Sequence, residues 1–364
     1  MRVVLVYLGR KGGGPAYSLE IAKQLRRQAD LFAVISALSE NADKWEAEGI
    51  QCLKVKTYNG MLSFIISSLK IFQFLKIRKK IKEFNPDIIY YPFFHPWLLF
   101  LNRLLPKIPK VYTCHDPVLH AGENNIITSF LQNKIIRESS RVIILSEIFK
   151  EKLLERGVKE ENIDVVPHGI FDYYWQYDHN LKRTSHPPTL LFFGRITPYK
   201  GLENLLIAFL DIKKKINQVR LLIVGEGDLT PYRKYLDQEG IAVFNQWIPE
   251  ADVANYFENV DLVVCPYTTA TQSGVIPIAY AAKLPVIATN VGGLANQVSD
   301  GITGRLVAPA NTQELVKACV DLMKDEPKRR QMGENGYELA RTKWGWGRVG
   351  ELVLQSLTKA QKKI

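Results

Sequence analysis

The chain is poor in cysteine and has no long apolar run. Four cysteines stand among 364 residues, none in a C-x-x-C pair: Cys52, Cys114, Cys265 and Cys319. Cysteines scattered in this way form neither a disulfide framework nor a zinc site, so we expect reduced, buried thiols in a reducing compartment. No stretch of 18 apolar residues occurs, which predicts no membrane-spanning helix. Met1 leads directly into a strand-like run without a signal-peptide pattern, so we expect a cytoplasmic protein.

Familiar cofactor signatures are missing as well. The glycines at 12–14 fit neither G-x-G-x-x-G nor G-x-x-x-x-G-K-[ST], which argues against a nicotinamide cofactor and against a P-loop. The apolar share of 46% and the charged share of 23% are those of a globular protein, so bulk disorder, collagen-like repeats and coiled coils are excluded. A chain of 364 residues is long enough for two domains, or three.

Positive charge is abundant but concentrated in one segment. The formal net charge is +11, and residues 51–110 hold 11 Lys or Arg against two acids, a local balance of +9. The remaining 304 residues hold 37 cations and 35 acids. Nucleic acid, an anionic membrane surface and phosphorylated substrates all attract such a segment. Since RNA-binding signatures with interleaved aromatics are not evident, nucleic acid is the least favoured of these partners.

Short apolar runs alternate with helical patterns along the whole chain. The first strand is predicted at Val3–Leu8, followed by a glycine-rich turn and a helix at Ala16–Leu25, with Pro15 at the first helical position. Further strands are predicted at 31–38, 87–91, 111–113, 141–145, 163–166, 189–193, 220–224, 242–244, 261–265 and 285–288. Further helices are predicted at 61–84 and 201–216 and within 326–363. Because strands that alternate with helices form parallel sheets, the predicted fold class is α/β.

The alternation is interrupted once, which divides the chain into domains. Residues 171–188 have no periodicity and end in two prolines, as an interdomain linker does. We therefore expect a Rossmann-like domain at 1–170 and a second one at 189–345. Two such domains in tandem would face each other across a central cleft, into which the carboxyl ends of both sets of strands point.

Three segments contain candidate ligand-binding groups. Arg195 and Lys200 lie in LFFGRITPYKG, where a buried strand ends at Gly194, and two cations at a strand end favour a diphosphate. The glycines at 12–14 would let backbone N–H groups approach a ligand. The polar loop YTTATQSGV begins at Tyr267 and leads into a helix. Each segment has a plainer interpretation as a solvated loop or a tight turn without a ligand.

Together these pieces resemble the retaining glycosyltransferases of family 4, which have the two-domain GT-B fold. The resemblance covers nearly the whole chain, and its order and spacing are specific although each piece alone is weak. The matching segments are GGGPAYSLEIAKQL, TCHDP, LSEIFKEKL, VVPHGI, FFGRITPYKG, IVGEGDL, WIPEADVANYFENVDLVVCPY and KLPVIATNVGG. The resemblance also implies that residues 346–364 form a C-terminal helix that crosses back to the N-terminal domain, which would bind the acceptor.

The resemblance implies roles for individual residues. Arg195 and Lys200 would neutralise the charge that develops on the leaving nucleotide diphosphate, so no metal would be required, in keeping with the absence of a D-x-D triplet. His115 would contact the transferred sugar near the reacting centre, unless it is a satisfied structural histidine. The residues implied to bind the donor are Gly13, Gly14, Gly194, Trp247, Ile248, Gln272, Ser273, Gly274 and Val275.

One departure from the family pattern concerns two glutamates separated by seven residues. Alignment without gaps from Pro285 places them at Ala270 and Ile278, so both carboxylates are absent. In the family the second one holds the ribose diol and the first touches the sugar. The surrounding loop stays orderly, so the sequence resembles a variant branch of the family, in which ribose recognition and the identity of the donor are open.

The basic segment includes a helical pattern at Met61–Phe84 with an apolar face and a cationic face. The cations of its second half include Lys76, Arg78, Lys79 and Lys80. Such a helix can lie on anionic lipid at the inner face of the cell membrane, or it can pack on the sheet with a solvated cationic face.

The sequence therefore predicts a retaining glycosyltransferase in surface-glycan assembly, of O-antigen, capsule or exopolysaccharide type. Its donor would be a nucleotide-diphosphate sugar, which is a co-substrate rather than a cofactor, and its acceptor a lipid-linked or polysaccharide chain. The alternatives are a sugar-nucleotide epimerase of the same fold and a non-catalytic glycan- or nucleotide-binding relative.

Overall fold

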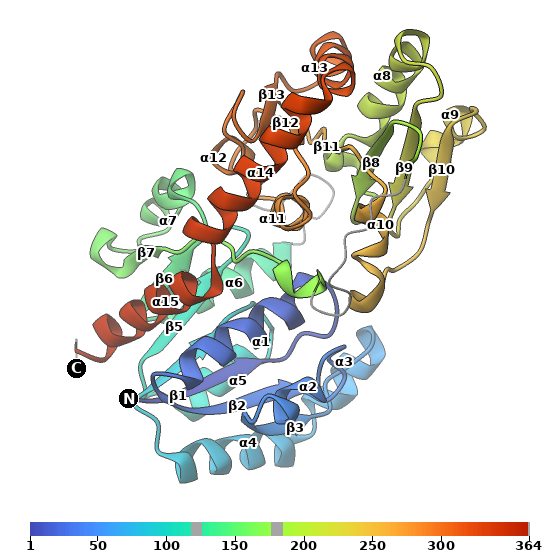
Figure 1. Cartoon of the computed structure of the whole chain (residues 1–364). Coiled ribbons are helices and arrows are strands. Elements are labelled where there is room, and N and C mark those ends of the chain that lie inside the picture. Colours follow the sequence, from blue (N-terminus) through green and yellow to red (C-terminus); the bar gives the residue numbers. More distant parts are fainter. Residues whose placement is uncertain (118–125, 176–184, 363–364) are drawn as a thin grey trace. The chain divides into compact units, whose positions relative to one another are not determined.

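The computed structural model of the chain describes residues 1–117, 126–175 and 185–362. The chain divides into two compact units, and each is built on one parallel β-sheet (Figure 1). Of the described residues, the first unit contains 1–117, 126–167 and 346–362, and the second contains 168–175 and 185–345. The predicted α/β class with two Rossmann-like halves is confirmed.

The sheet of the first unit has seven strands in the order β3-β2-β1-β4-β5-β6-β7, and neighbouring strands run parallel. They are β1 (Arg2–Tyr7), β2 (Asp30–Ser36), β3 (Gln51–Val55), β4 (Ile88–Tyr91), β5 (Lys110–Cys114), β6 (Arg141–Ile144) and β7 (Ile163–Val165). Every residue of β4 is buried, because apolar side chains pack on both faces of the sheet. This two-sided burial explains why the central strands are continuous apolar runs.

The helices of the first unit connect these strands. They are α1 (Gly13–Arg26), α2 (Lys44–Ala47), α3 (Met61–Ser68), α4 (Ile71–Phe84), α5 (Leu98–Leu104), α6 (Ile126–Glu138), α7 (Lys150–Glu155) and the C-terminal α15 (Trp346–Gln361). The helix α1 starts at Gly13, two residues before Pro15, which was predicted to be its first residue.

The sheet of the second unit has six strands in the order β10-β9-β8-β11-β12-β13. They are β8 (Thr189–Phe193), β9 (Arg220–Val224), β10 (Ile241–Phe244), β11 (Leu262–Cys265), β12 (Val286–Thr289) and β13 (Gly304–Val307). The helices are α8 (Leu202–Lys215), α9 (Arg233–Leu236), α10 (Asn255–Glu258), α11 (Val275–Ala281), α12 (Leu294–Gln297), α13 (Thr312–Lys324) and α14 (Glu326–Lys343). Of the segment predicted to be a linker, Asp172–Trp175 forms a short 3₁₀ turn, and 176–184 lies outside the described residues.

Strands and helices differ from the sequence prediction in three places. The single helix predicted at Met61–Phe84 is wrong: it is broken into α3 and α4 at Lys70, whose ψ of 73° is not helical. The Ser67 carbonyl at the break accepts the Lys70 N–H at 3.3 Å and the side-chain amide of Gln73 at 3.0 Å, so it stays hydrogen-bonded although the helix is interrupted. The sequence prediction also missed the strands β3 and β13, which are partly exposed and contain polar residues among their few apolar ones.

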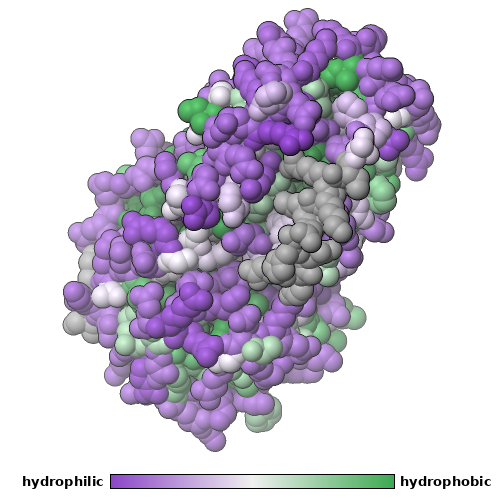
Figure 2. Space-filling view, viewed as in Figure 1, coloured by the Kyte–Doolittle hydropathy of each residue, from purple (hydrophilic) through white to green (hydrophobic). Residues whose placement is uncertain are grey.

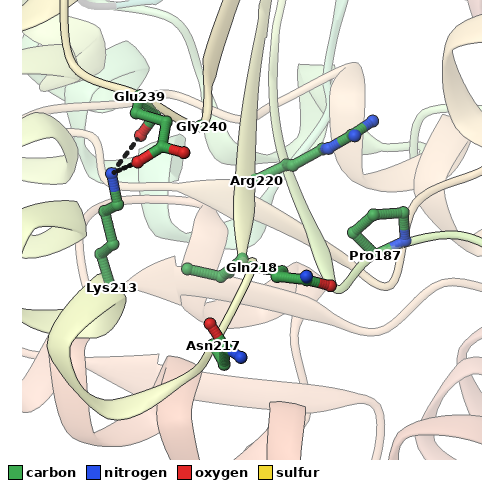
Figure 3. Close-up of a pocket in the computed structure, with 8 residues that line it drawn as sticks. Pro187, Lys213, Asn217, Gln218, Arg220, Glu239 and Gly240 are labelled. Carbon is green, nitrogen blue, oxygen red and sulfur yellow. Dashed lines mark hydrogen bonds and ion pairs between the residues drawn. The ribbon is translucent and has the colours of Figure 1, made fainter.

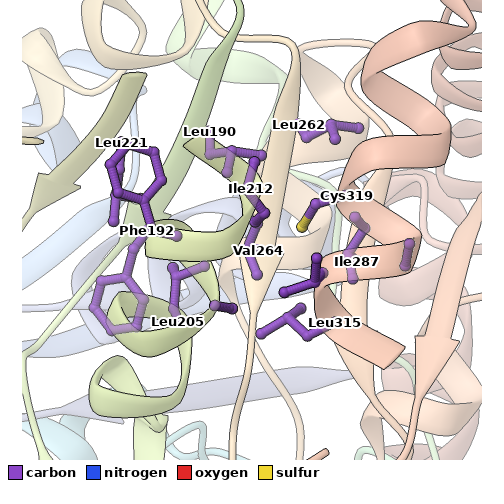
Figure 4. Close-up of a cluster of buried hydrophobic side chains, with 14 of the residues drawn as sticks. Leu190, Phe192, Leu205, Ile212, Leu221, Leu262, Val264, Ile287, Leu315 and Cys319 are labelled. Atoms are coloured by element: carbon purple, nitrogen blue, oxygen red, sulfur yellow. The ribbon is translucent and has the colours of Figure 1, made fainter. Parts of the chain in front are cut away.

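The core of the second unit lies between its sheet and two helices. Figure 4 shows side chains of β8, β9, β11 and β12 facing α8 and α13, with the buried thiol of Cys319 among them. All four cysteines are free, and three are buried, as predicted; Cys52 on the edge strand β3 is half-buried.

In both sheets the strand order reverses beside the first strand. The chain moves outward from β1 to β3 and then returns to the other side of β1 with β4, and it does the same from β8 through β10 to β11. At such a reversal the connections after the two central strands diverge to opposite faces of the sheet. The carboxyl ends of β1 and β4, and of β8 and β11, are therefore where a Rossmann-like sheet offers room for a ligand.

The C-terminal helix α15 packs on the first unit, against α1 and the strands β4 to β6. Its polar anchor is Asp164 of β7, whose carboxylate accepts hydrogen bonds from Arg141 at 2.6 Å, Ser356 at 2.7 Å and Lys359 at 2.9 Å. Partial burial alone would raise the pKa of Asp164, but these hydrogen bonds outweigh it and lower the pKa. Among the described residues, none of the helices has both the length and the apolar content that crossing a bilayer requires.

The anchor at Asp164 predicts a pH-dependent loss of stability. Asp164→Asn leaves the buried Arg141 guanidinium without its carboxylate and should lower the free energy of unfolding by about 3 kcal/mol at neutral pH. Because the folded-state pKa of Asp164 is depressed, its contribution is present above the ordinary aspartate pKa and is lost as the pH falls through the folded value. The difference between the wild type and the variant should therefore narrow in acid, as measured by urea unfolding at several pH values.

Glu155→Gln is the matched control for this prediction, because it breaks an exposed pair with Lys152 in the same unit. It should change the unfolding free energy little at any pH. A difference between wild type and Asp164→Asn that stays constant from neutral to acid pH would contradict the assignment of the anchor.

Candidate active site

The carboxyl edge of the second unit's sheet is built from closely packed backbone. Gly194 follows β8 with φ +104° and donates its N–H to the Val224 carbonyl at 2.9 Å. Gly225 follows β9, and a Cβ there would come within 2.1 Å of the Gly194 carbonyl oxygen. A side chain at Gly225 would force these two turns apart. The sequence motifs FFGR and IVGEG thus need glycine for close backbone approach.

Lys200 is a buried cation at the centre of this edge. It ends the 3₁₀ turn Pro198–Lys200, and its ammonium donates to the Tyr267 hydroxyl at 3.1 Å. The same ammonium lies against the Cα of Gly194, where an added Cβ would come within 2.7 Å of Nζ. The structure therefore brings Gly194 and Lys200 together, at the switch point between β8 and β11.

Tyr267 connects Lys200 to the loop that follows β11. Its hydroxyl lies 3.1 Å from the Ser273 hydroxyl, and Ser273 Oγ also accepts the N–H of Val275 at 3.2 Å. Burial raises the pKa of Tyr267 well above its ordinary value, so the hydroxyl stays neutral and can accept from Lys200 while sharing a proton with Ser273. Tyr267 was not among the predicted site residues.

The backbone around Ser273 is held by a second pair of hydrogen bonds. The Gln297 side chain accepts the Ser273 N–H at 2.8 Å and donates to the Ser273 carbonyl at 3.0 Å. Gly292 and Gly293 bring the next loop against this one, since a Cβ on either would overlap the carbonyl of Ala270 or Thr271. The loop is consequently fixed on both sides and presents Gln272 and Gly274 as half-exposed positions.

The remaining predicted residues of the second unit surround this centre. Arg195 is exposed on the turn directly after Gly194. Val275 lies within van der Waals distance of a Cβ built on Gly194. Trp247 is half-buried and Ile248 buried; both follow β10, which β9 separates from β8. The turn at Gly227 connects the region around Gly194 and Lys200 to the residues after β10, because it exchanges two 3.0 Å hydrogen bonds with Asn245 at the end of β10.

In the first unit, Gly13 and Gly14 form the start of α1 after β1. Gly12 before them has φ +87°, which suits glycine, and Gly13 is exposed with open space around its Cα. Gly14 is buried, and a Cβ there would come within 2.7 Å of the Tyr7 hydroxyl. Gly13 is thus the most exposed of the three glycines, and its backbone is open to a ligand.

His115 follows β5 and is buried in an aromatic cluster. Its ring stacks on Phe93 with centroids 3.7 Å apart, and Tyr17 meets it edge-on at 4.8 Å. His115 Nε2 lies 2.9 Å from the Pro92 carbonyl. Because a carbonyl oxygen only accepts, His115 Nε2 must carry a proton and donate it to Pro92.

The aromatic cluster also joins His115 to the glycine turn. Tyr7 at the end of β1 meets Phe93 at 6.0 Å and lies under Gly14, while Tyr17 of α1 meets Phe93 at 5.6 Å. Burial raises the pKa of Tyr17 to about 12. Sequence reasoning missed these three aromatics, although their positions directly after strands, or on the first helix, were a signal.

Of the four cations predicted to form a basic surface on α4, two lie beside an acidic side chain. Lys79 and Lys80 lie near Glu83, at 3.8 and 2.8 Å, while Lys76 is exposed and Arg78 half-buried on α4. Lys110, which adds to the charge of this segment, is buried and donates to the Leu105 carbonyl at 2.5 Å.

Two cavities of the second unit lie away from the predicted residues. Figure 3 shows the one at the amino ends of β8 and β9, lined by Pro187, Lys213, Arg220 and Gly240. Its lysine donates to the Glu239 carboxylate at 3.0 Å. The other is lined by Asp261 and Arg329, which pair with each other at 3.0 Å. Both are at the opposite edge of the sheet from Lys200. Among the described residues, no three His, Cys, Asp or Glu side chains gather as a metal site.

Each half of the chain matches a protein-family model. Residues 11–171 match the family model described as Glycosyltransferase Family 4, and residues 175–339 match Glycosyl transferases group 1. The D-inositol 3-phosphate glycosyltransferase of Paenarthrobacter aurescens is 27% identical over 70% of this chain and 67% of its own length. The alpha-monoglucosyldiacylglycerol synthase of Streptococcus pneumoniae is 27% identical over 69% of this chain and 62% of its own length.

Among solved structures, the Anabaena protein HepE in complex with UDP and glucose superposes with a TM-score of 0.75. It is 19% identical and covers 98% of this chain and 99% of its own, which shows the fold alone. The fold is thus the two-domain GT-B architecture. Each half of the chain matches a glycosyltransferase model, and the chain belongs to the glycosyltransferases whose halves are described as Glycosyltransferase Family 4 and Glycosyl transferases group 1.

Proposed function

We propose that the protein transfers a sugar, with retention at the anomeric carbon, from a nucleotide-diphosphate sugar to a lipid-linked or polysaccharide acceptor in surface-glycan assembly. The observation on which this rests is the buried ammonium of Lys200, held by Tyr267 against Gly194 at the carboxyl edge of the sheet. Arg195 adds an exposed cation on the turn between them. Two cations and a backbone without a Cβ suit a diphosphate, whose charge grows as it leaves.

The donor's other parts have candidate partners in the same unit. Trp247 and Ile248, beyond β9, would hold the nucleobase, and the turn at Gly227 fixes their distance from the diphosphate. Since the Ser273 hydroxyl already bonds to Tyr267 and to the Val275 N–H, Ser273 positions the loop rather than the ribose. Gln272, half-exposed beside it, is the side chain we assign to the ribose in place of the missing glutamate.

The transferred sugar would be recognised by the first unit. The backbone of Gly13 is accessible, and His115 has its ring fixed by Phe93 and its Nε2 proton committed to the Pro92 carbonyl. We assign both residues to the sugar. An imidazole fixed in this way suits a positioning contact.

In this proposal the reaction needs no protein nucleophile. The bond between the anomeric carbon and the diphosphate oxygen breaks, and the acceptor hydroxyl forms its bond on the same face while its proton passes to the leaving phosphate. Burial raises the pKa of the nearby Cys265 to about 11, so this thiol stays protonated. The contribution of Arg195 and Lys200 is to stabilise the charge on the leaving diphosphate.

The acceptor class and the location are also proposals. One relative is named as a synthase of a glucosyl diacylglycerol, and the basic helix α4 presents Lys76 and, beside Glu83, Lys79 and Lys80 to solvent. Arg78 lies half-buried between them. We infer a cytoplasmic enzyme that binds peripherally to the inner face of the cell membrane, where a lipid-linked acceptor is located.

Loss of either donor-site cation should slow the reaction strongly. Arg195→Ala or Lys200→Met should lower kcat by about 10²-fold or more, because each removes charge stabilisation of the leaving group. The methionine keeps most of the buried volume of Lys200, so thermal unfolding should stay near that of the wild type. Turnover is measured as release of nucleoside diphosphate; near-normal rates in both variants would contradict the assignment.

Tyr267 should matter for turnover through Lys200. Tyr267→Phe removes the hydroxyl that holds the ammonium, and we expect a decrease in kcat of about tenfold, as for one hydrogen bond to a charged group. Tyr280→Phe is the matched control, since this buried hydroxyl bonds only to Gln297 and Thr303 among the described residues. It should lower stability by about 1 kcal/mol and leave kcat unchanged. Equal kcat losses in both variants would indicate a general packing effect instead.

A panel of nucleotide sugars should identify the donor. A donor that binds only the folded protein raises the melting temperature, and the correct one should do so and also be consumed when an acceptor is present. Release of nucleoside diphosphate supports a transferase. An epimerase would instead return an isomerised nucleotide sugar, and a non-catalytic relative would bind the donor and leave it intact.

A further inference from the structure

The surface of the first unit includes a row of exposed apolar side chains on α3 and the first turn of α4. The face shown in Figure 2 is mostly hydrophilic, and seven of the fifteen exposed large apolar side chains among the described residues fall in this one row. Phe72 is 87% exposed, Leu69 74% and Leu62 73%. We call this row the α3–α4 crest; its residues are Leu62, Ile65, Ile66, Leu69, Ile71, Phe72 and Leu75.

The helix α3 presents an apolar stripe to solvent. Leu62, Ile65, Ile66 and Leu69 recur at helical spacing, and all four are exposed. On the inner side, Phe64 packs against the core and meets Tyr58 edge-on at 4.8 Å, and Ser68 Oγ accepts the indole N–H of Trp97 at 2.9 Å. The exposed stripe is therefore separate from the side of α3 that contacts the core.

The break between α3 and α4 fixes the crest in place. The bond from Gln73 to the Ser67 carbonyl holds the two helices at their junction. In α4, Phe74, Ile77 and Ile81 are buried at helical spacing and attach the helix to the core. The other side of its first turn therefore faces outward, with Ile71 and Phe72 next to Leu69 of the preceding helix.

Charge around the crest indicates what would cover it. Residues 61–82 contain six cations and no acid: Lys70, Lys76, Arg78, Lys79, Lys80 and Lys82. Lys70 stands at the break itself and is exposed. The buried centre of a protein–protein interface is depleted in lysine, whereas lysines beside a leucine- and phenylalanine-rich stripe are typical of helices at the boundary between lipid headgroups and acyl chains.

We propose that the α3–α4 crest inserts into an anionic phospholipid bilayer, with Leu69, Ile71 and Phe72 below the headgroups and the neighbouring lysines extending to them. The proposal rests on the proposed membrane location and deepens it, because it assigns the attachment to apolar insertion at the helix break rather than to the cationic face of α4 alone. The lysine stems cover apolar surface while their ammonium groups reach lipid phosphates.

The test is flotation of the full chain with vesicles of phosphatidylcholine containing phosphatidylglycerol. Leu69→Ser/Phe72→Ser should lower the partition coefficient at least about tenfold, since two large apolar side chains no longer leave water. Ile127→Ser/Phe130→Ser, which changes two exposed apolar residues of α6 in the same unit, should lower it less than about twofold. Both double variants alter exposed positions, and circular dichroism checks that they fold.

Salt separates insertion from purely electrostatic docking. Lys76→Gln/Lys79→Gln/Lys80→Gln should weaken binding at low salt, and in about 0.5 M NaCl this variant and the wild type should bind alike, because screening removes the charge contribution and leaves the apolar one. Binding of the wild type that vanishes in 0.5 M NaCl, or a Leu69→Ser/Phe72→Ser variant that binds as well as the wild type, would overturn the proposal.

Two further measurements distinguish other outcomes. If sedimentation velocity shows a dimer that Leu69→Ser/Phe72→Ser converts to a monomer, the crest is an interface between two copies of this chain and the lipid proposal is wrong. Release of nucleoside diphosphate with a water-soluble acceptor should be unchanged in the double variant. Loss of vesicle binding with intact sugar transfer in the double variant supports insertion of the crest. Absence of sugar transfer in the wild type would contradict the proposed function but not the insertion of the crest into lipid.

Discussion

The contact between the Lys200 ammonium, the Tyr267 hydroxyl and the Cα of Gly194 is the constraint on which the candidate site depends. A buried ammonium is costly unless it is hydrogen-bonded, and the one at Lys200 is held by a tyrosine that burial keeps neutral. Its position in turn requires glycine at 194, because a Cβ would meet Nζ at 2.7 Å. The loop that supplies Tyr267 is fixed by Gln297 on Ser273. A cation held in this way is available to an anion without a change of side-chain conformation, which is the preorganisation that electrostatic catalysis requires.

The two units use the carboxyl edges of their sheets differently. In the second unit, glycine turns bring backbone close together around a cation. In the first, aromatic rings surround His115 and the glycine turn at the start of α1. The glycine turns and cation of the second unit suit the charge of a diphosphate. The aromatic rings of the first unit suit the apolar face and hydroxyls of a sugar. The crest on α3 and α4 lies on the unit to which we assign the acceptor, which agrees with a hydrophobic anchor on that acceptor.

Much of the fold follows from the sequence, because strands buried on both faces are continuous apolar runs. β8 and β9 agree with their predicted bounds to the residue, whereas β3 and β13 were missed because polar or small residues interrupt their short apolar runs. The break at Lys70 was invisible to periodicity, since both helices keep apolar residues at helical spacing and only burial shows that the stripe of α3 faces outward. The glycines and cations at the carboxyl edge of the second unit's sheet were predicted from their positions after strands. Tyr267, Tyr7 and Phe93 were not, because their importance arises from contacts between loops that are distant in the sequence.

A crystal structure of the protein with a nucleoside diphosphate would show directly whether Lys200 binds the diphosphate. We expect phosphate oxygens about 2.7–3.2 Å from Lys200 Nζ, beside the backbone of Gly194 and within reach of Arg195. We also expect Tyr267 to keep its bond to the ammonium. A diphosphate bound elsewhere on the sheet, such as the cavity at Arg220 on the opposite edge, with Lys200 still bonded only to protein, would contradict this assignment.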